Sequence, residues 1–103
     1  MIKLKDILTE QAKTHEVIAT GIVFKPENIT IAEGDSVLWI NTQGVHNVNG
    51  KQSHPRNKNN PASFGNKVGK GWKYKFKFTK AGKYNYHCDP HLGVKMVGTV
   101  NVK

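Results

Sequence analysis

Three side chains that can bind a metal ion lie close together near the C-terminus. Cys88, the only cysteine of the chain, is followed by His91 after two intervening residues and by Met96 after four more. A thiolate and an imidazole, combined with a weak thioether donor, form the ligand set that selects copper in electron-transfer sites. This loop supplies three ligands, so a fourth must come from elsewhere. The leading candidate is His46, in the segment Gly44-Val45-His46-Asn47-Val48.

Zinc is the main alternative metal, but the donor types favour copper. Structural zinc sites use four strong ligands drawn from Cys and His and do not use Met. Thiolate and thioether are soft donors that suit copper. Cys88 and Met96 could also be ordinary core residues beside incidental histidines. Their placement on one loop between two strands, together with a separate histidine after an upstream strand, argues against that interpretation.

Length and composition predict one globular domain over residues 1–103. The chain has 37 % hydrophobic and 22 % charged residues, and it is too short for a second core. No stretch approaches the roughly 20 apolar residues of a membrane span. The first residues lack the apolar run of a secretory signal. We therefore expect a monomer without a transmembrane segment, either cytosolic or the mature form of an exported protein.

The chain carries a strong positive charge, which favours an acidic partner. It has 16 Lys and Arg against 7 Asp and Glu, a formal net charge of +9. Such a field speeds encounter with acidic proteins, nucleic acids or anionic membranes. In the segment 72–78, aromatic residues alternate with lysines and so lie on the opposite face of a strand. Nucleic-acid stacking platforms need both on one face, so we expect no nucleic-acid binding.

Alternating side chains predict an all-β fold that positions the ligands. In the segment 83–88, Tyr84, Tyr86 and Cys88 share one face, which aims Cys88 inward. Met96 enters the core from the start of a closing strand. Short strands separated by turns about every 8 to 12 residues are typical of a β-sandwich. The other predicted strands are 16–24, 28–32, 36–40 and 72–78.

Two segments do not follow the strand pattern. Residues 1–14 are expected to form an N-terminal extension, in which part of the segment 3–13 has helical spacing. Residues 49–70 are dense in Asn, Gly, Lys and Pro, and we expect a long surface loop with one helical turn. His87 faces away from Cys88 on its strand, so we expect it at the surface.

Three motifs make the chain resemble the blue copper proteins of the cupredoxin family, in the plastocyanin and pseudoazurin branches. They are Gly44-Val45-His46-Asn47-Val48, Tyr84-x-Tyr86-x-Cys88-x-Pro90-His91 and Met96-x-Gly98, and the resemblance covers about residues 15–103. It implies an antiparallel Greek-key β-sandwich with one copper ion near one end. The implied ligands are His46, Cys88, His91 and Met96. It also implies that Asn47 braces the two ligand loops and donates its backbone N–H to the Cys88 sulfur.

The resemblance also implies a function. It implies a small electron carrier, not an enzyme, that cycles between Cu(II) and Cu(I) by outer-sphere transfer with redox proteins. Pro90 has no N–H and cannot donate a second hydrogen bond to the thiolate. His91 would be the electron port in an apolar patch that docks partners. The other implied members of that patch are Gly44, Val45, Pro90, Leu92 and Val94.

Two departures from plastocyanins bear on the partner. His87 stands where plastocyanins place a surface tyrosine, and lysines replace the expected acidic surface. An acidic redox protein, such as a cytochrome or a copper-containing reductase, is therefore expected, and the resemblance implies a periplasmic or otherwise exported location. The alternative is copper delivery or storage, which usually needs more exchangeable ligands. A copper enzyme is disfavoured, because one cysteine cannot build a two-cysteine binuclear centre.

Overall fold

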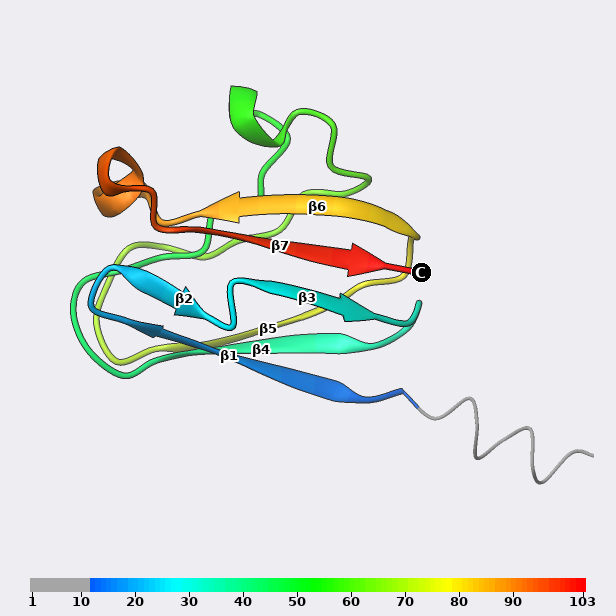
Figure 1. Cartoon of the computed structure of the whole chain (residues 1–103), viewed down its shortest axis with the longest axis horizontal. Coiled ribbons are helices and arrows are strands. Elements are labelled where there is room, and N and C mark those ends of the chain that lie inside the picture. Colours follow the sequence, from blue (N-terminus) through cyan, green and yellow to red (C-terminus); the bar gives the residue numbers. More distant parts are fainter. Residues whose placement is uncertain (1–11) are drawn as a thin grey trace, which may run out of the picture.

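The computed structural model describes residues 12–103, and within them seven strands form two sheets (Figure 1). One sheet has the order β2-β1-β4-β5 and contains β1 (Thr14–Thr20), β2 (Val23–Lys25), β4 (Ser36–Asn41) and β5 (Lys73–Lys77). The other has the order β3-β7-β6 and contains β3 (Asn28–Ile31), β6 (Gly82–His87) and β7 (Val97–Val102). The N-terminal extension is predicted over residues 1–14, and residues 1–11 of it lie outside the described part of the chain.

The predicted β-sandwich is confirmed, but its sheets are mixed and not purely antiparallel. β1 runs parallel to β4, and β3 runs parallel to β7. The pairs β1–β2, β4–β5 and β6–β7 are antiparallel. The chain changes sheets between β2 and β3 without reversing, so β4 returns beside β1 in the same direction (Figure 1). Side-chain alternation reports which face is buried, and it carries no information about the direction of a neighbouring strand.

Trp39 lies at the centre of an aromatic core between the sheets. It is fully buried, and four aromatic rings lie around it at centroid distances of 5.3 to 6.3 Å, from Phe64, Tyr74, Phe78 and Tyr86. Aromatic pairs of this kind contribute about 0.5–1.5 kcal/mol each beyond the area they bury. The lysines of β5 are exposed, as its alternation predicts. This core gives the ends of β4, β6 and β7 fixed positions.

The segment 49–70 is only partly a surface loop. It contains the expected helical turn, the 3₁₀ helix η1 (Pro55–Asn57). However, Phe64 is 3 % exposed and belongs to the core. The side chain of Asn60 donates to the carbonyl oxygen of Asn85 at 2.8 Å and accepts from its N–H at 2.8 Å. The segment therefore binds the edge of β6 that no strand covers, and it lies over β6 in Figure 1.

This packing contradicts the surface position expected for His87. The side chain is fully buried, and the ring of His54 lies 4.4 Å from it, centroid to centroid. The strand alternation does turn His87 away from the sandwich core, but the loop covers that face.

No helix in the described part of the chain is long and apolar enough to cross a membrane.

Candidate metal centre

The predicted ligands come together at one end of the sandwich. His46 follows the end of β4, and Cys88 follows the end of β6. The 3₁₀ helix η2 (Asp89–Val94) carries His91, and Met96 stands directly before β7. Because β4 and β6 end, and β7 begins, on the same side of the molecule, three strands bring together residues up to 50 positions apart (Figure 1).

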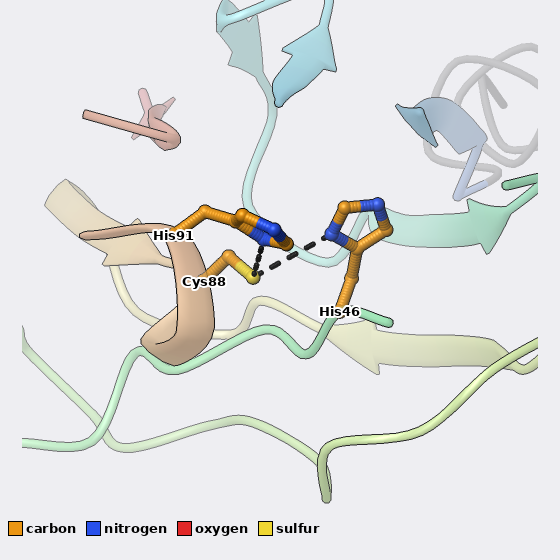
Figure 2. Close-up of side chains that lie close together, drawn as sticks. All are labelled: His46, Cys88 and His91. Carbon is orange, nitrogen blue, oxygen red and sulfur yellow. Dashed lines mark hydrogen bonds between the residues drawn. The ribbon is translucent and has the colours of Figure 1, made fainter. Parts of the chain in front are cut away.

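His46, Cys88 and His91 form a compact group of donor atoms. The Cys88 Sγ lies 3.6 Å from His46 Nδ1 and 3.4 Å from His91 Nδ1. Figure 2 shows both rings turning a nitrogen toward the sulfur. The ligand atoms of all three residues lie within 4.8 Å of one another. This spacing suits donors around one small ion.

His46 is oriented by contacts on both its ring and its backbone. Its Nε2 lies 2.7 Å from the carbonyl oxygen of Gln43, which leaves Nδ1 free to face Cys88. Its backbone exchanges two hydrogen bonds of 3.0 Å with Gly69, and Trp72 Nε1 donates to its carbonyl at 2.8 Å. Burial lowers the pKa of His46. A buried neutral imidazole whose second nitrogen is bonded to a carbonyl is the usual form of a metal-binding histidine.

Cys88 is a buried thiol in surroundings that disfavour a free thiolate. Burial raises its pKa, while hydrogen bonds from the backbone N–H groups of Asn47 and His91 oppose that rise. The Asn47 contact agrees with the one implied by the resemblance. The His91 N–H also donates to the Cys88 carbonyl at 3.2 Å. A cation beside the sulfur would stabilise the thiolate, so metal binding here releases a proton.

The loop from Cys88 to Met96 is closed by its own backbone. The Cys88 N–H donates to the Met96 carbonyl at 3.0 Å, and the Met96 N–H donates to the His91 carbonyl at 3.2 Å. Lys95 adopts the left-handed conformation, with φ of 63°, where η2 ends. Met96 is fully buried, whereas His91 is only half-buried. His91 is therefore the most accessible of the four predicted ligands.

Asn47 connects the two ligand segments through a residue that the sequence reasoning missed. Its Nδ2 donates to Asp89 Oδ2 at 2.9 Å, and its Oδ1 accepts from the Asp89 N–H at 2.8 Å. Asn66 supports the same segment by accepting from the Val48 N–H at 2.7 Å. The place of Asp89, between Cys88 and Pro90 in the loop motif, was the one signal that could have identified it.

The donor set fits copper. One cysteine sulfur, two imidazoles and a buried thioether lie at one end of the sandwich, and a soft sulfur pair with imidazole is what copper prefers. The chain matches the family model of copper binding proteins of the plastocyanin/azurin family over residues 11–103.

Similar proteins of known sequence are plastocyanins. Plastocyanin of Scenedesmus fuscus is 34 % identical over 87 residues, which cover 81 % of this chain and 89 % of that protein. The chloroplastic plastocyanin of Tetradesmus obliquus is 41 % identical over 89 residues, which cover 81 % of this chain and 60 % of that protein.

Solved structures with the same fold include an amicyanin and part of an enzyme. A reduced amicyanin mutant has a TM-score of 0.71 at 28 % identity, covering 92 % of this chain and 88 % of that chain. A copper-containing nitrite reductase from Thermus scotoductus SA-01 has a TM-score of 0.72 at 26 % identity. This chain covers only 22 % of the reductase, so the likeness extends to one part of that enzyme.

Fold and donor set together define a cupredoxin, a β-sandwich with a copper site at one end. The chain belongs to the plastocyanin/azurin family of copper-binding proteins. It is a type 1 blue copper protein that binds one copper ion and carries electrons.

Proposed function

We propose that this protein carries single electrons between redox proteins, with one copper ion bound by His46, Cys88, His91 and Met96. When bound, copper supplies the Cu(II)/Cu(I) couple. The observation that carries the proposal is the convergence of the His46, Cys88 and His91 donor atoms within 4.8 Å, where Cys88 and His91 share one loop with the buried Met96. Four protein ligands leave no open position for a substrate, so we propose outer-sphere transfer and no enzymatic activity of its own.

Rigid ligands make electron transfer efficient, because little has to move when the charge changes. The His46 ring is held by the Gln43 carbonyl, and its backbone is held by Gly69 and Trp72. The Cys88 backbone is bonded to Met96 across the ligand loop. These contacts fix the donor atoms before the metal arrives, which is the preorganisation that a binding site of defined geometry needs.

We propose His91 as the electron port. It is half-buried, and two large apolar side chains of the predicted patch are well exposed, Val45 at 39 % and Val94 at 56 %. Gly44 and Pro90 are also exposed, and Leu92 is half-buried. An apolar surface around a partly accessible ligand would let a partner exclude water and approach the metal closely.

The proposed partner is an acidic redox protein, such as a cytochrome or a copper-containing reductase. The exposed lysines of β5, which are Lys73, Lys75 and Lys77, supply part of the net charge of +9 that would attract it. We further propose that the protein is a monomer in the periplasm or another exported compartment.

The visible absorption spectrum tests the proposed function. Cu(II) added to the reduced apoprotein should give an intense blue or green colour, and Cys88→Ser should abolish it. Met96→Gln should keep the colour and lower the reduction potential, because an amide oxygen is a harder donor that favours Cu(II). A colourless copper-loaded protein would refute the proposal. Rapid copper loss to a mild chelator would favour delivery or storage instead.

A further inference from the structure

The carboxylate of Asp89 accepts hydrogen bonds from three side chains beside the metal centre. Asn47 Nδ2 donates at 2.9 Å, and Asn49 Nδ2 donates to both oxygens at 3.0 and 3.3 Å. The ring of His87 contacts the carboxylate through Nε2 at 2.9 Å. These donors come from the segment after His46 and from β6, so one side chain joins both ligand segments.

The donors are more deeply buried than their acceptor. His87 is 0 % exposed and Asn47 is 2 % exposed, whereas the Asp89 side chain is 45 % exposed. Within residues 12–103, the other His87 ring nitrogen, Nδ1, has no hydrogen-bond partner. Asn47 Nδ2 has one other contact, the Asn66 carbonyl at 3.4 Å. Loss of the carboxylate would therefore leave buried donors poorly paired, which is costly.

An ionised carboxylate suits this arrangement of donors. It offers two oxygens that accept and no group that donates, whereas an amide or a hydroxyl would also present a hydrogen to the same donors. The backbone adds to the connection, because Asn49 and His87 exchange hydrogen bonds of 2.8 and 3.1 Å between N–H and carbonyl groups.

We propose that Asp89 is a positioning residue that locks the Cys88 segment onto the His46 segment and lowers the reduction potential of the bound copper. This inference rests on the proposed function. Asn47 is the neighbour of His46 and Asp89 is the neighbour of Cys88, so the paired side chains set the separation of two ligands. A fixed negative charge next to the thiolate also favours Cu(II), the more positive state, over Cu(I).

Three variants of the copper-loaded protein separate the effect of the hydrogen bonds to Asp89 from the effect of its negative charge. Asp89→Asn removes the negative charge and adds an amide N–H donor next to side chains that are themselves donors. Glu33→Gln makes the same change in net charge in the exposed turn before β4. This turn lies at the start of β4, whereas His46 follows its end. Asn49→Ser weakens the hydrogen bonds to Asp89 and keeps the charge. For each we would measure the midpoint potential by spectroelectrochemistry, copper loss to a chelator, and thermal unfolding of the apoprotein.

Asp89→Asn should raise the potential above that of Glu33→Gln, and the copper affinity should fall by about ten- to a hundredfold, as for other residues that orient metal ligands. Its apoprotein should also unfold at a lower temperature. Asn49→Ser should lose copper faster than the parent, with a smaller change in potential, and it keeps the test open if Asp89→Asn does not fold.

If Asn49→Ser retained copper as well as the parent protein does, the positioning role of Asp89 would be overturned. If Asp89→Asn had the same reduction potential as Glu33→Gln, the proposed effect of Asp89 on the potential would be overturned. These failures differ from a failure of the proposed function, in which the parent protein itself would form no coloured Cu(II) site.

Discussion

Gly44 is held in a backbone conformation that other residues rarely adopt, directly beside the His46 ring. Its φ is +95°, and a Cβ built on it would lie 2.9 Å from His46 Nε2, closer than real Cβ contacts allow. That nitrogen is the one that contacts the Gln43 carbonyl. At the scale of single residues, the orientation of a ligand therefore depends on the absence of a side chain two positions earlier.

Gly44→Ala should displace the His46 ring and alter the copper site. We expect a changed visible spectrum, faster copper loss, and a loss of about 1–2 kcal/mol in the free energy of unfolding from the positive φ. Gly34→Ala is the matched control, because its φ is +93° and nothing lies within 4 Å of its Cβ. It should lose similar stability with the spectrum unchanged. A normal spectrum in Gly44→Ala would contradict the argument.

At the scale of elements, Asp35 connects the start of β1 to the turn before β4. Its buried carboxylate accepts from the backbone N–H groups of Lys13 at 3.0 Å and Ala32 at 3.2 Å. His15 Nε2 lies 2.9 Å from the same carboxylate. The His15 contact and then the Lys13 N–H hold the pKa of Asp35 below its ordinary value. The parallel pairing of β1 with β4 begins at this contact.

Asp35→Asn should destabilise the protein by about 1–3 kcal/mol at pH 7, because charge-assisted hydrogen bonds are lost. Since the pKa is lower in the folded state, this stabilisation is present above about pH 4 and disappears as the pH falls through the folded value. Urea unfolding at pH 7 and at about pH 2.5 measures this stabilisation. The gap between variant and parent should shrink at the lower pH, and a constant gap would contradict the linkage.

The segment 49–70 acts as an element of the core, although it contains no strand. The Phe64 ring stacks on Trp39 at 5.6 Å and on Phe76 at 5.3 Å between centroids. Gly50 makes room for it, because a Cβ there would lie 2.2 Å from the Phe64 ring.

Phe64→Ala should lower the free energy of unfolding by about 3–5 kcal/mol, the usual result of removing a buried aromatic ring. Val68→Ala in the same segment is the control, because Val68 is 49 % exposed and surface changes usually stay within about 0.5 kcal/mol. Chemical denaturation of the apoprotein measures both. Equal, small losses in the two variants would show that the segment contributes little to the core.

At the scale of the whole molecule, the net charge of +9 should govern encounter rates. Ions screen such attraction over about 10 Å at 0.1 M salt. Reduction by an anionic iron–cyanide complex should therefore slow as salt rises, whereas reaction with a cationic cobalt complex should accelerate. Stopped-flow absorbance of the copper band measures both rates. Rate constants independent of salt for both reagents would contradict electrostatic steering.

The sequence alone predicted what depends on short-range patterns. Donor types and spacing in residues 88–96 indicated copper, and the alternation along β6 placed Cys88 and Tyr86 inside. The glycine before His46 and the Pro90-His91 pair completed the family motifs. These features are local, because the period of a strand and the spacing of a loop act over a few residues.

Only the tertiary structure decided the contacts between distant segments. It showed that β1 and β3 each have a parallel partner, that Phe64 belongs to the core, and that His87 is buried under residues 49–70. The loop from Cys88 to Met96 was recognisable by its donors, but its link to Asn47 through Asp89 spans 42 positions. No periodicity encodes such a pair, because it forms only where the packing of two sheets places the ends of β4 and β6 side by side.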